Sequence, residues 1–517
     1  MPEESKVKFN IVQTAFWMAV LTLGSKLFGF VREMTMASFF GTSYIVDAYV
    51  MANAIPGMLF AAFFAAIATA YMPMLSERIE LRGEDLGKSF TSQILKVLLV
   101  FSVIVSLLGI LLSNELVSIF APGFSGETAS LAGFFLKISF LYLIFTSISR
   151  IFDNYIQYKG TFIPQIIIGY LQNLIVISVI IISAFTTHYL LAFGLLIAYF
   201  LRMILYGSLA KGRGYRYLKS SDKLKETVKQ IAILGIPVFI GSGMQQINLF
   251  VDRMLASGLR EGSIAALNYG AILNALIMSL SISVLTTLIY PRLNKASARN
   301  EIDHFISIMN RGLVLVVMVA LPFSLGAMVY SGEVVQIVFE RGAFDVNATS
   351  LTATAYLFYS VGLLFMAVND LMLRGYYALH DMKTPMIYAG IGVVVNITLN
   401  LLLIKSMAHG GLALATSIAA LVNCVLLLYG FRKKIPEGKL ITSYSKYGKI
   451  GVSSVVSVGL SKGFYELLVR SLWMPRMVYL GVAVLLAVGA YWVFLRVFKV
   501  EEIDLIKNLF KKGHGSE

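Results

Sequence analysis

The stretch of sequence that decides the fold reads Gly24-Ser25-Lys26-Leu27-Phe28-Gly29-Phe30-Val31-Arg32-Glu33, and it lies inside an apolar run from about residue 9 to residue 40. The run is long enough to cross a bilayer as a helix. An ionised side chain at the bilayer centre costs about 3 kcal/mol, so such groups normally face a wet cavity enclosed by protein. We therefore predict a membrane-spanning helix that lines a pathway.

The composition extends this prediction to the whole chain. Of its 517 residues, 58% are hydrophobic and 14% are charged, which predicts a polytopic membrane protein of the all-α class. The single cysteine, Cys424, excludes an internal disulfide and a cysteine-rich metal site. The five histidines show no zinc-ligand spacing. No cleavable leader pattern precedes the first helix, so we expect that helix to be retained.

The net charge of +15 is distributed unevenly between the connecting segments. Basic residues crowd the segments 211–229, 292–299, 432–449 and 496–512, whereas 114–127 and 184–190 contain no Lys or Arg. An excess of Lys and Arg marks cytoplasmic loops. We predict that the basic segments and both termini are cytoplasmic, and that the charge serves topology and contact with anionic membrane lipids instead of nucleic acid.

Hydropathy and loop signals predict fourteen spans, an even number that agrees with both termini lying on one side of the membrane. The predicted spans lie near residues 9–40, 47–75, 89–113, 129–154, 162–183, 187–210, 228–257, 264–293, 304–330, 347–376, 385–404, 410–431, 447–470 and 475–498.

A weak internal repeat organises the first twelve spans. The string Tyr155-Ile-Gln-Tyr-Lys-Gly-Thr-Phe-Ile-Pro164 matches Tyr376-Tyr-Ala-Leu-His-Asp-Met-Lys-Thr-Pro385 at an offset of 221 residues, and Pro73-Met-Leu75 matches Pro291-Arg-Leu293 at an offset of 218. Six spans separate the copies, so the copies share one membrane orientation. We expect two six-helix lobes, 1–210 and 228–431, around a central cavity. A basic linker at 211–227 joins them, and two additional helices at 447–498 and a cytoplasmic tail at 499–517 follow.

The charges in the first span form a candidate site. Lys26 and Glu33 are close to two helical turns apart and share one face at a separation of roughly 10 Å. Arg32 adds a fork for phosphate oxygens where Lys26 adds a point charge, which suits an anion. Gly24 and Gly29 permit a bend or a close helix approach beside these charges. As an alternative, Arg32 pairs with Glu33 or Asp47 to join helices, or the charged groups snorkel to an interface.

A second group of polar residues lies in later spans. Asp252-Arg253 repeats the position of Arg32-Glu33 at an offset of 220, so Arg253 is a candidate cation from the second lobe. Asn396 and Asn400 share a helix face, and with Asp252 and Thr416 they would offer oxygens to a hard cation. As alternatives, Asp252 and Arg253 neutralise each other, and the two asparagines hydrogen-bond a neighbouring helix.

Several of these strings together resemble the MurJ (MviN) family of lipid II flippases, in the multidrug/oligosaccharidyl-lipid/polysaccharide exporter superfamily. They are Ser25-Lys26-x-x-Gly29-x-x-Arg32-Glu33, Asp47-Ala48-Tyr49, Gln246-Ile-Asn-Leu249 and Tyr376–Pro385. The resemblance covers all fourteen spans. It implies export of undecaprenyl-pyrophosphate-linked GlcNAc-MurNAc-pentapeptide from the inner to the outer leaflet of the bacterial cytoplasmic membrane by alternating access. It also implies a groove for the lipid tail at 447–498, and contact with the peptidoglycan synthesis machinery.

The resemblance also implies roles for individual residues. Lys26, Arg32 and Arg253 would hold the pyrophosphate, while Glu33 and Asp47 would hold these cations in place between substrates. A sodium site would comprise Asp252, Asn396, Asn400, the Leu412 carbonyl and Thr416. We expect no cofactor, with Na⁺ or the membrane potential as the driving force.

The sequence departs from the family pattern in two places. Phe60-Ala61 and Ala65-Ala66 stand where span two of the family usually carries a basic pair and Glu-Gly. The segment Gly270–Leu273 stands where span eight of the family carries an arginine, and Arg253 is expected to compensate.

Three other functions remain open at this point. One is a flippase for another polyprenyl-linked oligosaccharide, of the capsule or O-antigen type. A drug/cation antiporter should have net carboxylates in its cavity, so the excess of Lys26 and Arg32 counts against it. A membrane enzyme acting on the same lipid would need a carboxylate catalyst on a sizeable loop, and no connection here is long enough to fold one. We therefore expect a transporter, not an enzyme.

Overall fold

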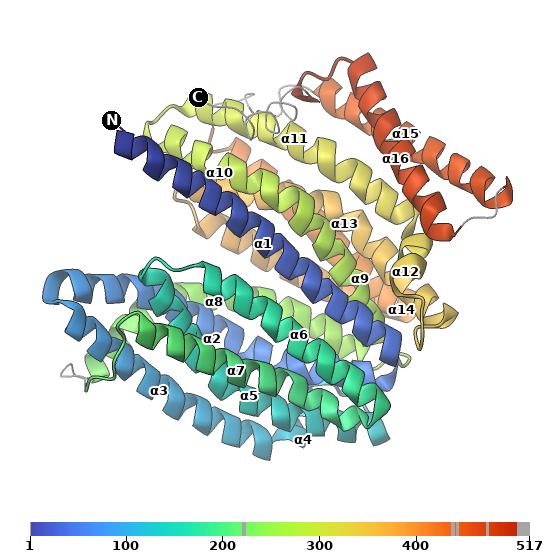
Figure 1. The fold of residues 1–517 in the computed structure, drawn as a ribbon. Coiled ribbons are helices and arrows are strands. Elements are labelled where there is room, and N and C mark those ends of the chain that lie inside the picture. The colour runs from blue at the N-terminus through green and yellow to red at the C-terminus, as the bar shows by residue number, and fades with distance from the viewer. Residues whose placement is uncertain (1, 220–223, 436–439, 441–443, 472–474, 504–517) are drawn as a thin grey trace. The chain divides into compact units, whose positions relative to one another are not determined.

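The computed structural model describes residues 2–219, 224–435, 440, 444–471 and 475–503, and these residues form helices joined by short connections (Figure 1). Parts of the predicted linker (220–223) and tail (504–517) lie outside the described residues. The helices are α1 (Pro2–Phe40), α2 (Tyr44–Arg82), α3 (Glu84–Leu111), α4 (Ser113–Phe120), α5 (Gly126–Tyr158), α6 (Ile163–Phe185), the 3₁₀ turn η1 (His188–Leu190), α7 (Leu191–Gly212), α8 (Leu224–Ala256), α9 (Ser263–Ile277), the π-helical turn η2 (Met278–Ile282), α10 (Ser283–Ala298), α11 (Ile302–Val329), α12 (Ser331–Phe339), α13 (Val346–Ala378), α14 (Lys383–Arg432), α15 (Tyr444–Ser471) and α16 (Arg476–Val497).

Each of the predicted spans falls on one or more of these helical elements. By length and apolarity alone, 11 helical segments of the described residues could cross a membrane. The segment Lys383–Arg432 has 50 residues and covers two predicted spans. Span eight is assembled from α9, η2 and α10, which together form the continuous segment Ser263–Ala298. The prediction of an all-α polytopic membrane protein is confirmed.

The long helix α14 is two helices joined at a sharp break. Ala408 has a non-helical backbone, with φ 47° and ψ −131°. A Cβ atom on Gly411 would lie 2.7 Å from the carbonyl oxygen of Leu403, so the chain folds tightly here. The side-chain amide of Asn396 donates a hydrogen bond of 3.2 Å to the hydroxyl of Thr416. The two halves of α14 therefore lie side by side, as two consecutive spans should.

Two short helices, α4 and α12, were not predicted. The sequence Ser113-Asn-Glu-Leu-Val-Ser-Ile-Phe120 forms α4, and Ser331-Gly-Glu-Val-Val-Gln-Ile-Val-Phe339 forms α12, at an offset of 218 residues. Each follows directly on a long helix, α3 or α11, and precedes the connection to the next span. The internal repeat therefore includes these connecting helices as well as the spans.

The matching strings at residues 155 and 376 have a shared structural role. Tyr155 and Tyr376 are both fully buried, each within the hydrophobic core of its own part of the chain. Two residues past the end of the helix that carries each tyrosine lies a residue with positive φ, Gly160 at 76° and His380 at 57°. The left-handed residue ends the helix and starts the turn into the next span.

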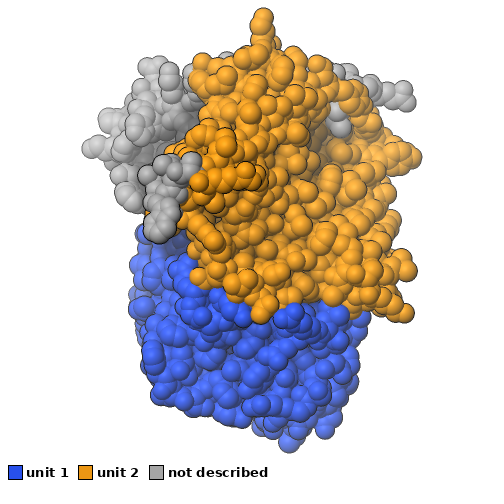
Figure 2. Space-filling view, turned by 90° about the vertical axis from the view of Figure 1, so that its right-hand side faces the viewer, with its two compact units in different colours: residues 1–265, 341–345 blue, residues 266–340, 346–517 orange. Residues whose placement is uncertain are grey.

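The chain divides into two compact units (Figure 2). Unit 1 comprises residues 1–265 and 341–345, and unit 2 comprises residues 266–340 and 346–517. In unit 1, α8 packs along α2, α5 packs along α2 and α7, and α1 packs along α6. In unit 2, α13 packs along α14 and α11, and α15 packs along α16. The predicted lobes, 1–210 and 228–431, follow the internal repeat of the sequence and stay a prediction. The boundary between the two units differs from the boundary between the predicted lobes because α8 packs on α2.

Candidate functional site

Arg32 is held on α1 by two neighbours within unit 1. Its Nη2 and Nε atoms lie 2.5 Å and 3.1 Å from Oε1 of Glu33, and its Nη1 donates a hydrogen bond of 3.3 Å to Oδ1 of Asn173 on α6. The side chains of Arg32 and Glu33 are 30% and 17% exposed. A partly buried guanidinium is thus neutralised by its sequence neighbour and oriented by α6. Asn173 was not predicted, since nothing in the sequence pairs α1 with α6.

The glycine next to these charges explains how α1 and α6 come so close. A Cβ atom on Gly24 would lie 2.0 Å from the hydroxyl oxygen of Tyr170, which donates a hydrogen bond of 2.9 Å to the carbonyl of Leu21. The expected close helix approach at Gly24 is therefore present. Lys26 lies in the same stretch and its side chain is exposed in the structure.

Asp47 lies apart from this pair and meets a helix N-terminus instead. Its Oδ2 accepts a hydrogen bond of 2.7 Å from the backbone N–H of Gly262, and its Oδ1 accepts one of 2.7 Å from the backbone N–H of Ala265. Asp47 is only 4% exposed. Of the two carboxylates expected to hold Arg32, the structure brings Glu33 to it, whereas Asp47 caps the start of α9.

The capping is reciprocal. Glu261, just before α9, accepts a hydrogen bond of 2.8 Å from the backbone N–H of Tyr44 at the start of α2. Gly262 has φ 85°, and a Cβ atom on it would lie 2.2 Å from the carbonyl oxygen of Thr42. Unsatisfied N–H groups at a helix start favour a negative charge. A carboxylate from each helix start therefore accepts hydrogen bonds from backbone N–H groups of the other helix start.

Close backbone contacts also join the end of α1 to the segment 341–345, which belongs to unit 1. A Cβ atom on Gly41 would lie 2.4 Å from the carbonyl oxygen of Ala343, and one on Gly342 would lie 2.2 Å from that of Ser38. The backbone N–H of Ala343 donates a hydrogen bond of 2.8 Å to Ser38. A side chain at either glycine would force these segments apart.

A third contact joins the connection after α4 to the end of α8. A Cβ atom on Gly123 would lie 2.3 Å from Cα of Gly258, and the Gly123 N–H donates to Oγ of Ser257 at 3.2 Å. We call residues 38–44, 121–125, 257–265 and 341–345 the glycine cluster. The predicted topology of fourteen spans with both termini cytoplasmic places all four segments on the non-cytoplasmic side.

Arg253 lies next to the glycine cluster. It is partly buried in the last turn of α8, which ends at Ala256, and its neighbour Asp252 is 6% exposed. Arg32 lies eight residues before the end of α1 at Phe40. Arg253 therefore lies nearer the end of its helix than Arg32 does.

Four of the five residues expected to bind sodium come together in α14. The side-chain amide of Asn400 donates a hydrogen bond of 2.9 Å to Oδ1 of Asn396, and the hydroxyl of Thr416 donates one of 3.1 Å to the Leu412 carbonyl. Asn396 and Asn400 are fully buried. The bond from Asn396 to Thr416 joins the two halves of α14, as the alternative interpretation expected for an asparagine, and the four residues together gather neutral oxygens. The fifth residue, Asp252, belongs to unit 1.

The two departures from the family pattern have a packing explanation. Phe60 lies 6.2 Å from the ring of Phe101 on α3, so an aromatic contact stands where the family usually has a basic residue. A Cβ atom on Gly270 would lie 3.0 Å from the backbone nitrogen of Tyr356, so α9 packs closely on α13. At both positions the residue found in this chain packs against a neighbouring helix.

Unit 2 contains a charged pair that the sequence analysis missed. On α13, Nε of Arg374 lies 3.5 Å from Oδ2 of Asp370, which also accepts a hydrogen bond of 2.5 Å from Thr286 of α10. The guanidinium carbon of Arg374 lies 5.8 Å from the ring centre of Tyr290. The sequence does contain a sign of this pair, because Asp370 and Arg374 are four residues apart inside the predicted span 347–376. Unit 2 therefore has an arginine of its own within a span.

Comparison with known proteins gives consistent results. The family model described as "Lipid II flippase MurJ" matches residues 36–498. A probable lipid II flippase MurJ of Rhizobium meliloti is 30% identical over 419 residues, covering 78% of each chain. One of Rhizobium tropici is 28% identical over 510 residues and covers 95% of each chain.

Solved structures show the same fold. A structure titled "Lipid II flippase MurJ, inward closed conformation" matches with a TM-score of 0.82 at 23% identity, over 94% of this chain and 100% of that one. An inward-facing multidrug resistance MATE family transporter of the MOP superfamily matches with a TM-score of 0.65 at 13% identity, over 80% of this chain and 98% of that one.

Proposed function

The chain belongs to the lipid II flippase MurJ family, and from this membership we propose how it works. It is a multi-pass membrane transporter, and its function is that of a lipid II flippase. We propose that it carries undecaprenyl-pyrophosphate-linked GlcNAc-MurNAc-pentapeptide from the inner to the outer leaflet of the bacterial cytoplasmic membrane by alternating access. The observation that carries this function is the family match over residues 36–498.

The pyrophosphate contact is proposed to centre on Arg32. Its guanidinium is already oriented by Glu33 and Asn173, so a phosphate can replace the carboxylate without a large rearrangement of the arginine. Arginine binds phosphate through two parallel N–H bonds, and this geometry is stronger than a single neutral hydrogen bond. Lys26, exposed on the same helix, adds a second positive charge. Glu33 then compensates Arg32 between substrates, which avoids an uncompensated partly buried charge.

The second cation is proposed to be Arg253 or Arg374. Arg253 is supported by its position in the repeat, and Arg374 by its location inside a span of unit 2 beside Asp370. The two are separated by substitution. If Arg253 binds the pyrophosphate, Arg253→Ala weakens lipid II binding about as strongly as Lys26→Ala does. If Arg253→Ala leaves binding intact and Arg374→Ala weakens it, the contact belongs to Arg374.

We propose that the glycine cluster holds four non-cytoplasmic connections of unit 1 together. Its segments carry only two basic residues, Arg260 and Arg341, far fewer than the basic connections predicted to be cytoplasmic. Separating these connections requires the Asp47 and Glu261 caps to break and the close glycine contacts to part. Two-sided labelling tests the orientation: in a Cys424→Ala background, cysteines at Thr186 and Lys219 react from opposite sides of the membrane, with Lys219 cytoplasmic. Labelling from the same side contradicts it.

Sodium is proposed as the coupling ion. Neutral oxygens of Asn396, Asn400, Leu412 and Thr416 gather at the break of α14, and Asp252 would supply the carboxylate that a cation site needs. Replacing Na⁺ by choline should slow lipid II transport in wild type more than in Asp252→Asn. Equal sensitivity of both proteins to Na⁺ removal contradicts this site. The membrane potential is the alternative driving force.

The lipid II assignment is tested by complementation. The chain is expressed in a strain whose own lipid II flippase can be switched off, and growth is followed after depletion. Growth is expected with the wild type and not with Arg32→Ala, provided that both proteins reach the membrane. If the wild type accumulates in the membrane and growth still stops, the substrate is another polyprenyl-linked oligosaccharide. A capsule or O-antigen flippase mutant is then the next host.

A further inference from the structure

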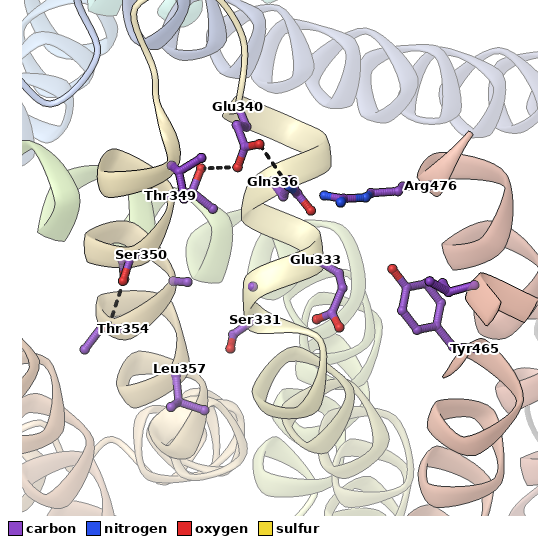
Figure 3. A pocket seen from close by; sticks show the side chains of 14 residues that line it. Ser331, Glu333, Gln336, Glu340, Thr349, Ser350, Thr354, Leu357, Tyr465 and Arg476 are labelled. Atoms are coloured by element: carbon purple, nitrogen blue, oxygen red, sulfur yellow. Dashed lines mark hydrogen bonds between the residues drawn. The ribbon is translucent and has the colours of Figure 1, made fainter. Parts of the chain in front are cut away.

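A pocket of about 640 Å³ opens within unit 2, between α12 and α13 on one side and α15 and α16 on the other (Figure 3). Its volume lies in the range of about 300–1,000 Å³ that is typical of small-molecule sites. Its lining contains none of the residues proposed above to bind the pyrophosphate or sodium. Tyr465, Val469 and Arg476 belong to the segment 447–498, in which the resemblance implies a groove for the lipid tail, but the charged lining does not suit an apolar tail. The pocket therefore needs an explanation of its own.

One wall of the pocket carries two fixed carboxylates. Glu340 accepts hydrogen bonds of 2.8 Å from the amide of Gln336 and 2.7 Å from the hydroxyl of Thr349. Glu333 forms an ion pair with Lys462 of α15. These partners orient both carboxylates and leave lone pairs unused, because an ionised carboxylate can accept about four hydrogen bonds. This wall suits a primary ammonium, which brings three N–H donors.

The opposite wall carries a cation. Arg476 is the first residue of α16 and is exposed, and among the described residues no carboxylate lies within ion-pair distance of it. The free N–H groups at a helix start and a guanidinium both favour a phosphate group. Figure 3 shows Arg476 directed across the pocket toward Gln336, the partner of Glu340. The pocket thus presents a positive group opposite a negative wall.

Apolar side chains flank this polar interior. Val346 and Val469 line the pocket and are 72% and 44% exposed, and Met477, next to Arg476, is 72% exposed. In a membrane protein such exposed apolar side chains contact lipid acyl chains. A ligand with a charged head and apolar chains fits both parts of the site.

We propose that this pocket binds the headgroup of a phospholipid that carries a phosphate and a primary ammonium, as phosphatidylethanolamine does. The phosphate lies at Arg476 and the start of α16, and the ammonium lies at Glu340 and Glu333. The acyl chains follow Val346, Val469 and Met477. Phosphatidylcholine lacks N–H donors on its nitrogen and phosphatidylglycerol lacks the positive charge, so neither satisfies the acidic wall.

Native mass spectrometry of the full-length protein tests this proposal with three lipids of identical acyl chains. Phosphatidylethanolamine is expected to bind about tenfold more tightly than phosphatidylcholine or phosphatidylglycerol, since a charge-assisted hydrogen bond contributes at least that factor. Arg476→Gln and Glu340→Gln should each abolish this preference of about tenfold. Arg470→Gln and Glu466→Gln, at exposed positions of α15 outside the pocket lining, are the matched controls and should leave it unchanged.

Equal binding of the three lipids to the wild type would overturn the proposal. So would a preference that survives Arg476→Gln, a substitution at an exposed position that should not impair folding. A preference for phosphatidylglycerol that Glu340→Gln leaves unchanged would identify the ligand as an anionic lipid and also reject the proposal. Thermal unfolding of each variant separates loss of the site from loss of the fold.

Discussion

The carboxylate of Asp47 accepts a hydrogen bond of 2.7 Å from the backbone N–H of Gly262, which joins the start of α2 to the start of α9. The two positions are equivalent in the internal repeat, because Thr42-Ser43 corresponds to Gly262-Ser263 at an offset of 220 residues. Glu261 returns the contact through the backbone N–H of Tyr44. A conformational change that separates these helix starts must break both caps together.

Removing the Asp47 cap should loosen the glycine cluster. Asp47→Ala leaves two buried N–H groups without their acceptor, at a cost of about 1–3 kcal/mol each. A cysteine at Ser257, which is 5% exposed, then reports opening through its labelling rate in a Cys424→Ala background. We expect faster labelling in Asp47→Ala. The control is Glu127→Ala, which removes only an exposed bond to the Tyr44 hydroxyl and should not change the rate. Equal rates in all three proteins would contradict the role of the cap.

A methyl group at Gly342 should have a similar effect by steric means. Gly342 has φ 60°, and the added Cβ would lie 2.2 Å from the Ser38 carbonyl oxygen. Gly126→Ala is the matched control, because Gly126 has φ 52° but nothing within 4 Å of the added Cβ. Backbone strain alone costs about 1–2 kcal/mol in both variants. We expect Gly342→Ala to lower the unfolding temperature further and to speed labelling at Ser257. If the two variants have the same unfolding temperature and the same labelling rate, the close contact at Gly342 does not contribute to stability.

The arginine site predicts a graded response to substitution. Arg32→Ala should abolish lipid II transport, because the pyrophosphate then enters the membrane interior without a fork of donors. Arg32→Lys retains the charge but not the two parallel bonds, so we expect partial activity. Asn173→Ala removes the 3.3 Å contact that orients the guanidinium, together with a bond to the Gly169 carbonyl of its own helix, and a smaller loss of transport is expected. Full transport by Arg32→Ala would show that the pair with Glu33 serves structure alone.

The connection between α13 and α14 gives a pH-dependent prediction. Burial alone would raise the pKa of Asp381, but hydrogen bonds from Lys434 and the Thr384 N–H outweigh burial and lower the pKa to about 2. A lowered folded-state pKa contributes stability above the usual pKa of about 4, and this contribution is lost as the pH falls toward 2. Asp381→Asn keeps an acceptor for the Thr384 N–H but loses the charge opposite Lys434, so it should cost up to about 1 kcal/mol at pH 7, as for a partly exposed ion pair. Thermal unfolding from pH 7 to pH 3 should show the gap to wild type narrowing below pH 4. A constant gap would contradict the prediction.

Much of the fold was predictable because its signals are local. Long apolar runs predicted the spans, and two short strings predicted the repeat, whose tyrosines 155 and 376 are both buried. The short helices α4 and α12 were missed because eight or nine residues carry too little periodicity to separate from a loop. The break at Ala408 was not predicted as a single strained residue, because no proline marks it.

The candidate site was predictable only in part, since it depends on tertiary contacts. The pair of Arg32 and Glu33 is visible in the sequence because the two residues are adjacent. Asn173 and the Gly262 partner of Asp47 are 141 and 215 residues away from their partners, and no spacing rule connects them. The packing of Phe60 and Gly270 likewise depends on the neighbouring helices α3 and α13.

Transport of lipid II by the purified protein tests the central claim most directly. The wild type and Arg32→Ala are reconstituted into vesicles whose lipid II is initially confined to one leaflet, and the fraction reaching the other leaflet is followed over time. We predict transfer with the wild type, and with Arg32→Ala no more than in protein-free vesicles. If lipid II crosses equally fast with both proteins, or stays in place with the wild type while another polyprenyl-pyrophosphate oligosaccharide crosses, the account is contradicted.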